Sequence, residues 1–392
     1  MPNETMTESV MQTYNRFPLT LVKGKGSYVW DDAGEKYLDF SSGLATCNLG
    51  HVPEKVEQAV KEQLGELWHC SNLFHIPSQQ QLAKLLADNS SLDQVFFCNS
   101  GAEANEAAIK IARRYAQEEA KNGRHEIVTF TQSFHGRTLT TLSATAQEKI
   151  QQGFAPLTPG FHYLPFNDFD AIKEVADRKP CAILVEMVQG EGGVNPASKE
   201  WMQALAQTCK ENDILFMIDE IQTGFGRTGT LFAYEQYEVD PDVITLAKGL
   251  GSGLPIGAML AKEQVAKAFS PGTHGSTFGG NPIVTTSGLA TLKEIAETSL
   301  LSDIKPLIDQ LWQGLEQIAS KYDVIKEVRG KGFLIGVEVE GQAIDYITKA
   351  REEYQTLIIV AGPNVIRILP PLTTNKEEIE AFLNTFEKLF AE

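Results

Sequence analysis

The alternation of apolar and polar positions divides the chain into regions with different patterns of elements. Across the central region, helical stretches alternate with short apolar runs. This alternation predicts an α/β domain with a mainly parallel sheet, because crossover helices connect parallel strands. The expected helices are 53–64, 77–87, 102–119 and 199–211, and the expected strands are 95–98, 127–130, 182–188, 214–218 and 243–246.

The regions on either side predict a second, smaller unit. Tyr28–Trp30 and Lys36–Phe40 flank a turn signal and predict a β-hairpin, which we expect to pack with the C-terminal part. The C-terminal pattern predicts helices at 283–297, 300–321, 343–355 and from 376, and strands at 332–340, 357–360 and 365–368. The expected domains are 1–48 (N-terminal arm and hairpin, packing with the small domain), 49–285 (large α/β domain) and 286–392 (small α+β domain).

Composition and charge exclude several classes of protein. Hydrophobic residues make up 42% and charged residues 22% of the 392 positions, which indicates a folded globular protein. The 34 Lys and Arg against 51 Asp and Glu give a net charge of −17, which repels the phosphates of nucleic acids. No apolar run approaches the roughly 18 residues that span a bilayer, and Met1–Met11 lacks the pattern of a targeting signal. We expect a cytoplasmic protein that binds neither nucleic acid nor membrane.

Cysteine and histidine spacing does not favour disulfides or a metal site. The five cysteines are odd in number, widely spaced and without a CxxC pair, which is typical of reduced thiols. His69 and His75 match no common two-ligand motif. We expect no bound metal.

Two polar residues each end an apolar run in the most informative stretch, residues 214–257. Leu215–Ile218 has the pattern of a buried strand, so Asp219 emerges at the carboxyl edge of the sheet, where open α/β folds bind ligands. Val243–Ala247 delivers Lys248 in the same way. A lysine removed from water loses its proton more easily and becomes a nucleophile able to form a Schiff base with a carbonyl cofactor. Lys248 is the candidate covalent anchor, and Asp219 needs a cationic partner.

Two loops of small residues precede expected helices. Ser100, Gly101 and Ala102 stand where free backbone N–H groups can bind a phosphate, although Ser100 alone also fits an ordinary N-cap. Ser276 and Thr277 stand in a similar loop, whose plain alternative is a flexible connection.

Phe134 and Arg137 follow another expected strand. An aromatic ring can stack on a planar heterocycle, and a guanidinium can bind a carboxylate through two hydrogen bonds. Separately, each residue is as readily explained by core packing or surface exposure. The glycines after Lys248 suggest a dinucleotide loop, but Pro255 follows them and no helix is expected there, so the Rossmann pattern fails.

Together these motifs resemble those of the class III, pyridoxal-phosphate-dependent aminotransferases. The matching segments are DEIQTGFGRTG, TLAKGLGSGLPIG, NSGAEANEAA, SFHGRT, VEMVQGEGG and HGSTFGGNP, within a similarity that runs from about Tyr14 to Pro371. The resemblance implies the α/β fold type I architecture, with a mainly parallel sheet in a large domain and a smaller α+β domain. It also implies pyridoxal 5′-phosphate as cofactor and a homodimer with active sites at the interface.

The resemblance assigns cofactor roles position by position. Lys248 would bind the cofactor covalently and act as general acid and base, and Asp219 would pair with the protonated pyridine nitrogen. The other cofactor residues would be Ser100, Gly101 and Ala102 at the phosphate, Phe134 on the ring, Gln222 near the ring hydroxyl and, from the neighbouring subunit, Thr277.

The implied substrate residues are Arg137, Glu191, Arg367, Ser276 and Tyr14. The acceptor 2-oxoglutarate has two carboxylates and needs both arginines, whereas the amine donor has one carboxylate at its far end. Glu191 would mask Arg367 in the donor half-reaction, because an unpaired buried guanidinium is unfavourable.

Within the family, the chain is similar to the acetylornithine aminotransferases, with ornithine aminotransferases as near relatives. Gly43 stands where ornithine-specific relatives tend to carry a tyrosine, which leaves space for an acyl group, whereas Tyr14 matches a substrate-binding tyrosine of ornithine enzymes. A further departure is Met187, where many relatives have proline.

The resemblance implies transfer of the terminal amino group of N2-acetylornithine to 2-oxoglutarate in arginine biosynthesis. The products would be N-acetylglutamate 5-semialdehyde and glutamate, formed with ping-pong kinetics. The alternatives are transfer from ornithine, succinylornithine or 4-aminobutyrate, and a decarboxylase or aminomutase of the same class. Outside the class, the glycine-rich segments leave a nicotinamide oxidoreductase or a non-catalytic binding protein.

Overall fold

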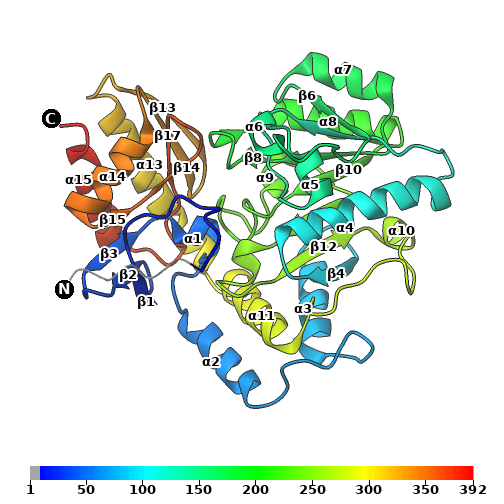
Figure 1. The fold of residues 1–392 in the computed structure, drawn as a ribbon, viewed down its shortest axis with the longest axis horizontal. Helices are drawn as coiled ribbons and strands as arrows, with labels where there is room; N and C mark the ends of the chain where they lie inside the picture. Colours follow the sequence, from blue (N-terminus) through cyan, green and yellow to red (C-terminus); the bar gives the residue numbers. More distant parts are fainter. Residues whose placement is uncertain (1–8, 392) are drawn as a thin grey trace.

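The computed structural model describes residues 9–391, so residues 1–8 of the expected N-terminal arm and residue 392 lie outside the described residues. Figure 1 shows a large sheet with helices on both faces at one side of the molecule. Two smaller sheets lie at the other side with the C-terminal helices. The α/β fold class and its large, mainly parallel sheet are confirmed.

A seven-stranded sheet forms the centre of the larger part, in the order β4-β12-β11-β10-β7-β5-β6. β12 runs antiparallel to both of its neighbours, and the pairs among β11, β10, β7, β5 and β6 are parallel. Most strands are buried along their whole length because helices cover both faces, and this explains their nearly continuous apolar sequences. The strands are β4 (Gln94–Cys98), β5 (Ile127–Phe130), β6 (Phe161–Leu164), β7 (Ala182–Glu186), β10 (Leu215–Asp219), β11 (Val243–Leu246) and β12 (Gly257–Ala261).

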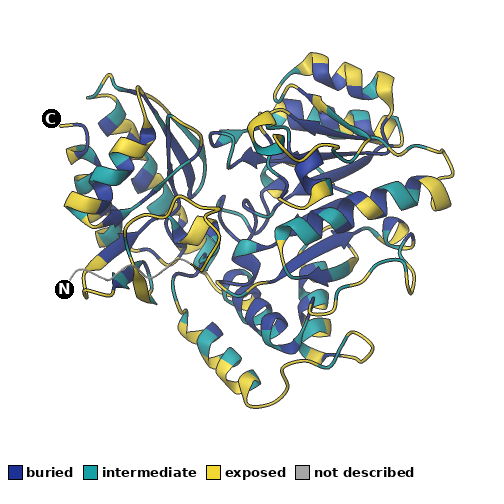
Figure 2. Ribbon diagram, in the orientation of Figure 1, coloured by how far each residue is buried: buried dark blue, intermediate teal, exposed yellow. Residues whose placement is uncertain are grey.

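The helices of the larger part present apolar faces to the sheet and polar faces to solvent, as Figure 2 shows for α4 and α7. α4 begins where the Ser100 side chain accepts a hydrogen bond from the N–H of Glu103 (3.2 Å), and it continues as a π-helix over Tyr115–Glu119. The helices are α2 (Glu54–Leu64), α3 (Pro77–Asp88), α4 (Gly101–Arg114), α5 (Leu139–Ala144), α6 (Glu148–Gln151), α7 (Phe169–Arg178), α8 (Lys199–Glu211), α9 (Tyr234–Tyr237), α10 (Glu263–Ala266) and α11 (Pro282–Ala296).

The smaller sheets bring the two ends of the chain together. In the first, Leu38 of β3 is paired in parallel with Thr356 of β15. Its strands are β1 (Leu21–Lys25), β2 (Tyr28–Asp31), β3 (Lys36–Asp39) and β15 (Thr356–Leu357), and those of the second are β13 (Ile325–Lys331), β14 (Leu334–Val339), β16 (Ile359–Val360) and β17 (Val365–Ile368). The remaining elements are α1 (Ser42–Ala45), β8 (Val188–Gln189), β9 (Asn195–Pro196), α12 (Leu300–Asp303), α13 (Lys305–Ala319), α14 (Ala343–Tyr354) and α15 (Lys376–Lys388).

Several expected elements differ from the observed ones. The expected helix 300–321 is two helices, because Pro306, the second residue of α13, lacks the N–H that would continue the preceding turn. The expected strand 332–340 is the second arm of a hairpin, β13–β14. α11 crosses the expected boundary at 285/286 between the large and the small domain, and it packs on α2 and α3. The division into domains stays a prediction. Across residues 9–391, no helix combines the length and apolar character that a bilayer crossing requires.

Candidate active site

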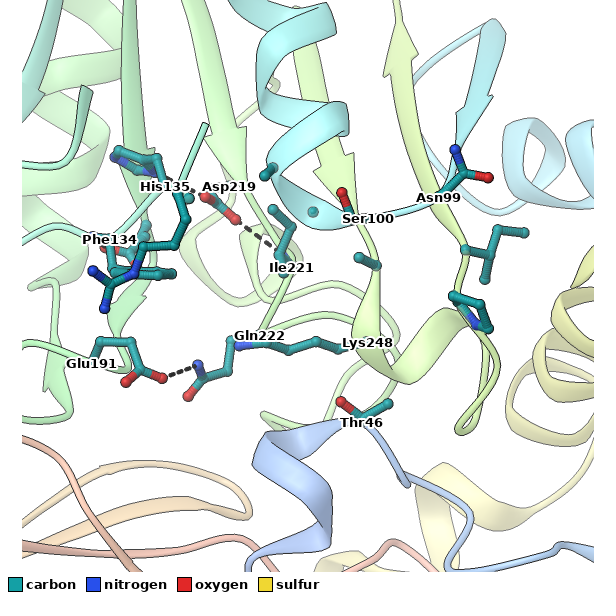
Figure 3. Close-up of a pocket in the computed structure, with 18 of the residues that line it drawn as sticks. Thr46, Asn99, Ser100, Phe134, His135, Glu191, Asp219, Ile221, Gln222 and Lys248 are labelled. Atoms are coloured by element: carbon teal, nitrogen blue, oxygen red, sulfur yellow. Dashed lines mark hydrogen bonds and ion pairs between the residues drawn. The ribbon is translucent and has the colours of Figure 1, made fainter. Parts of the chain in front are cut away.

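The site lies where the parallel strands of the large sheet end. A cavity of about 480 Å³ opens there, between the turns after β4, β7, β10 and β11 (Figure 3). Its walls include predicted cofactor and substrate residues from segments far apart in the sequence: Ser100, Gly101, Ala102, Phe134, Arg137, Glu191, Asp219, Gln222 and Lys248. The topology therefore assembles most of the predicted site at one sheet edge.

Asp219 is the last residue of β10 and is 4% exposed. One of its oxygens, Oδ2, accepts from Nδ2 of Asn105 (2.8 Å) and lies 2.8 Å from Nδ1 of His135. The other, Oδ1, accepts from the backbone N–H of Ile221 (3.0 Å). Donors on both oxygens fix the direction of the buried carboxylate, which faces the cavity.

Lys248 follows β11 after one residue and begins a short 3₁₀ turn with φ of 42°. Its side chain extends into the cavity toward Gln222 (Figure 3). Desolvation lowers its pKa, and the nearby carboxylates of Glu191 and Asp219 oppose this shift without reversing it. Within residues 9–391 no carboxylate forms an ion pair with its amine. Lys248 thus presents an amine that gives up its proton more readily than an ordinary lysine.

Arg367, from β17, is buried at the side of the cavity and forms an ion pair with Glu191 (2.6 Å). Its Nη1 also donates to Oε1 of Gln222 (3.1 Å), and Nε2 of Gln222 donates to Glu191 (3.3 Å; Figure 3). Burial opposes ionisation of Glu191, but Arg367 and Lys248 outweigh this and lower its pKa. A fixed cation is therefore covered by a carboxylate that faces the cavity.

The loop between β4 and α4 forms another wall. Ser100 is exposed to the cavity as the N-cap of α4, and Gly101 and Ala102 are the first residues of this fourteen-residue helix. A Cβ on Gly101 would lie 2.8 Å from Cδ1 of Ile221, so the glycine lets the start of the helix approach this side chain closely. The free N–H groups and the positive end of the helix dipole suit an anion.

Phe134 and Arg137 line the same cavity from the turn after β5. The backbone N–H of Phe134 donates to Oε2 of Glu186 (3.2 Å), which fixes the turn. The guanidinium carbon of Arg137 lies 5.5 Å from the centre of the Phe134 ring, and the Arg137 side chain is exposed. Its charge is therefore available to a ligand carboxylate.

Besides Arg367, which is buried behind Glu191, three predicted site residues do not line this cavity. Tyr14 is 74% exposed and contributes nothing to the cavity wall. Ser276 and Thr277 lie in the loop before α11, where Oγ of Ser276 accepts from Nδ2 of Asn99 (3.2 Å) and from the N–H of Gly279 (3.0 Å). They line a separate, smaller hollow on the outer side of the β4–α4 turn. Within one chain, the structure does not bring these residues to Lys248.

Sequence reasoning assigned no role to several residues that build the site. Glu186 ends β7 and pairs in register with Asp219 of β10, a relationship that the strand-end pattern could have revealed. Burial and the charge of Asp219 raise its pKa well above the ordinary value. His135 and Asn105 hold Asp219 from the β5 turn and from within α4, and no spacing rule connects them to it. Thr46 lines the cavity from the segment after α1. Met187 is fully buried directly after β7.

The donor set fits a planar, phosphorylated, aldehyde-bearing cofactor with a basic ring nitrogen. Within residues 9–391, the buried carboxylate of Asp219 forms an ion pair with no basic side chain other than His135, which suits a ring cation. The start of α4 suits the phosphate, and Lys248 suits the aldehyde. Phe134 supplies an aromatic face at the cavity wall.

The match with known proteins agrees with this geometry. The family model for aminotransferase class III matches residues 9–390, and the chain belongs to this family. Aminotransferases of this class use pyridoxal 5′-phosphate as their cofactor.

The chain is 59% identical over 387 residues to the acetylornithine aminotransferase of Oceanobacillus iheyensis, covering 99% of this chain and 97% of the relative. It is 52% identical over 367 residues to that of Halalkalibacterium halodurans, covering 94% of both.

Among solved structures, the ornithine aminotransferase of Toxoplasma gondii, described with partial occupancy of PLP at its active site, superposes with a TM-score of 0.93. It is 33% identical and covers 97% of this chain and 92% of its own. The N-acetylornithine aminotransferase of Stenotrophomonas maltophilia gives a TM-score of 0.84 at 36% identity, covering 96% and 97% of the two chains.

Proposed function

We propose that the chain transfers the terminal amino group of N2-acetylornithine to 2-oxoglutarate, as a cytoplasmic step of arginine biosynthesis. The observation that carries this proposal is the Arg367–Glu191 ion pair beside Lys248. With Glu191 on Arg367 the charge of the guanidinium is compensated, and with Glu191 moved away the same cavity presents an uncompensated cation. The identity to acetylornithine aminotransferases over nearly the whole chain supports the choice of donor.

Asp219 and Lys248 have different roles in the proposed reaction. When bound, pyridoxal phosphate supplies an electron-withdrawing ring that stabilises the charge left when a proton leaves the substrate carbon. Asp219 keeps a proton on the ring nitrogen by presenting a fixed negative charge. Lys248 holds the cofactor and, once its amine is free, takes a proton from the substrate carbon and returns it as general base and acid.

Substrate charge is matched by the two arginines. Arg137 would bind the carboxylate common to both substrates, and its exposed guanidinium is free to do so. For 2-oxoglutarate, Glu191 would swing away so that Arg367 binds the second carboxylate. For the amine donor, Glu191 would stay on Arg367 and keep its charge compensated.

Space next to Thr46 would accommodate the acetyl group. Gly43 has φ of 58°, and a Cβ there would meet only Sγ of Cys47 (3.6 Å) and Cβ of Thr46 (4.0 Å). A tyrosine at this position would place a ring on this side of the cavity. The glycine therefore favours an acylated donor over free ornithine, and Tyr14, which does not line the cavity within this chain, adds no support for ornithine.

We also propose a homodimer in which Thr277 completes the phosphate site of the partner subunit. The loops before α3 and α11 carry exposed apolar side chains, and large exposed apolar patches mark interaction surfaces. Asn72 ties the two loops together by donating to the carbonyls of Ser276 (3.0 Å) and Gly279 (2.9 Å). The exposed side chains are Leu67, Trp68, Leu73, Phe74 and Phe278.

Steady-state kinetics with acetylornithine and ornithine at one 2-oxoglutarate concentration tests the donor. We expect kcat/KM to be higher for acetylornithine, and a preference for ornithine would overturn the donor but not the class. Borohydride reduction of the cofactor-loaded protein followed by peptide mapping tests the anchor, and the label is expected on Lys248.

Mixed subunits test the shared site. Lys248→Ala and Thr277→Ala subunits are each expected to be weakly active alone. A mixed dimer would regain one site that combines Lys248 of one subunit with Thr277 of the other. No recovery on mixing, with exchange verified by mass spectrometry, would contradict the shared site.

A further inference from the structure

Arg367 reaches the cavity from a different sheet than the residues it meets there. It belongs to β17, in the sheet β13-β14-β17-β16, whereas Asp219 and Lys248 come from strands β10 and β11 of the seven-stranded sheet (Figure 1). In its own sheet, Arg367 is paired with Gly336 of β14 and with Ile359 of β16. The position of its guanidinium in the cavity therefore depends on how the two sheets are held together.

Arg227, in the loop after β10, joins the two sheets close to β17. Its Nη1 donates to the carbonyls of Pro370 and, at 3.2 Å, of Phe333. Its own backbone carbonyl accepts from the N–H of Phe333 (2.9 Å). The antiparallel register of β14 and β17 places Phe333 and Pro370 opposite each other, just beyond the paired residues. One guanidinium therefore closes the end of the strand pair that contains Arg367.

Asn48 holds the same guanidinium from another segment and connects it to the cavity walls. Its Oδ1 accepts from Nη2 of Arg227 (2.6 Å), and its Nδ2 donates to the carbonyl of Phe225 (2.8 Å). A Cβ on Gly249, the residue after Lys248, would lie 2.3 Å from Nδ2 of Asn48. Asn48 and Arg227 are therefore packed against the turn that carries Lys248 as well as against the end of β17.

The charge of Arg227 is buried without a carboxylate. Across the described residues, its guanidinium donates to Asn48 and to backbone carbonyls only, and its Nε has no partner. Burial lowers the pKa of Arg227 to about 9, so the group is still a cation at neutral pH. A buried cation without a counter-charge is unfavourable, so packing alone does not explain an arginine here. The planar guanidinium does, however, fix the direction of every acceptor it meets.

We propose that Arg227 is a positioning residue for Arg367, which it holds through Pro370 and Asn48 at the distance from Arg137 that a five-carbon dicarboxylate spans. This inference rests on the proposed binding of the second carboxylate of 2-oxoglutarate by Arg367. Arg227 itself does not line the cavity and acts only through the segments it joins. Its loss should therefore weaken the binding of dicarboxylates and spare monocarboxylates, which need Arg137 alone.

The test measures equilibrium binding to the full-length, cofactor-loaded protein by isothermal titration calorimetry. The probes are two unreactive acids of equal chain length, glutarate and pentanoate. The wild type is expected to prefer glutarate, because only the dicarboxylate reaches both Arg137 and Arg367. Arg227→Lys keeps the charge but replaces the planar fork by one ammonium. The preference for glutarate should fall by about tenfold in this variant, through weaker glutarate binding alone.

Arg113→Lys is the matched control. Arg113 of α4 also donates to two backbone carbonyls, those of His125 (3.1 Å) and Pro159 (2.8 Å), and it does not line the cavity. This variant should keep the wild-type preference. An unchanged preference in Arg227→Lys, with a native circular dichroism spectrum, would overturn the proposal. An equal loss of affinity for both acids would also overturn it, because a general disturbance of the fold has that effect.

Asn48→Ala is the second variant, and it removes one acceptor of Arg227 together with the contact to Phe225. The preference for glutarate should fall by about threefold. If Arg227→Lys does not fold, an unchanged preference in Asn48→Ala overturns the proposal. A wild type without any preference would overturn the proposed role of Arg367, and this inference with it. A wild-type preference that both variants retain overturns the inference alone.

Discussion

Arg367 and Glu191 are in contact at 2.6 Å, yet their side chains differ in exposure: 1% for the guanidinium and 31% for the carboxylate. Arg367 is also held by the carbonyl of Gly190 (2.9 Å) and by Gln222. In the part of the chain that the structure describes, the Glu191 carboxylate has no other hydrogen-bond partner than Arg367 and, at a longer distance, Gln222. Any change in this pair must therefore come from movement of Glu191 while Arg367 stays fixed.

Glu191→Gln should affect the two half-reactions unequally. A glutamine can stay near Arg367 but leaves its charge uncompensated when the amine donor binds. We expect kcat/KM for the donor to fall by about 10- to 100-fold, or about 1.4–2.8 kcal/mol, with the value for 2-oxoglutarate within about threefold. Single-turnover absorbance measurements resolve the two halves. Glu340→Gln, which breaks an exposed pair with Lys326, should change neither, and equal losses in both halves would contradict the masking role.

Asp219→Asn should lower turnover by about 10²- to 10³-fold, because it removes a preorganised charge from a buried site. The neutral side chain keeps the shape and most of the hydrogen bonds, so the loss reports charge. Steady-state assays at saturating cofactor measure it. Asp240→Asn, at an exposed pair with Lys262, serves as the control. Nearly normal turnover in Asp219→Asn would mean that the ring nitrogen does not face this carboxylate.

Gly43→Tyr should reverse donor selectivity. The ratio of kcat/KM for acetylornithine to that for ornithine is expected to fall by about tenfold or more, because the ring fills the space proposed for the acetyl group. Gly43→Ala carries the same penalty of a side chain at φ of 58° without the ring. The alanine variant should therefore keep the wild-type ratio. A ratio that falls equally in both variants would assign the effect to the backbone.

Glu220 predicts a pH-dependent stability. It is 1% exposed beside the site, and burial raises its pKa to about 7. A raised carboxyl pKa contributes stability below its unfolded value, and this contribution is lost as the pH rises toward 7. The loss amounts to about 3 kcal/mol at most. The thermal midpoint of the wild type, at fixed protein concentration, should therefore fall relative to that of Glu220→Gln between about pH 5 and pH 8.

Glu316→Gln, at an exposed position of α13, is the matched control for the stability measurement and should follow the wild type. Parallel pH curves for the wild type and Glu220→Gln would show that Glu220 is ionised throughout.

The strand-end residues were the most predictable part of the site. Asp219 ends one buried apolar strand and Lys248 follows another after one residue, so sheet topology alone brings them to one edge. His135 and Asn105 were not predictable in this way, because their contacts with Asp219 depend on how a turn and a helix pack across the sheet.

The limits of fold prediction have the same origin. β12 was missed because its sequence GAMLA has no β-branched residue and follows a glycine-rich loop, so its strand conformation depends on pairing with β4 and β11. β6 lies at the sheet edge and is only partly buried, which weakens its apolar pattern. Tertiary pairing, which the local pattern does not encode, fixes both strands.

The parallel pairing of β3 with β15 joins residues near opposite ends of the chain, with Leu38 beside Thr356. During synthesis on the ribosome, the first hairpin emerges long before its neighbouring strand exists. One edge of β3 therefore stays unpaired until nearly the whole polypeptide has been translated. The large sheet, in contrast, contains no strand that follows β12 in the sequence. The earliest-made strands are thus among the last to be completed, and a nascent chain stalled before residue 356 would leave that edge open to aggregation.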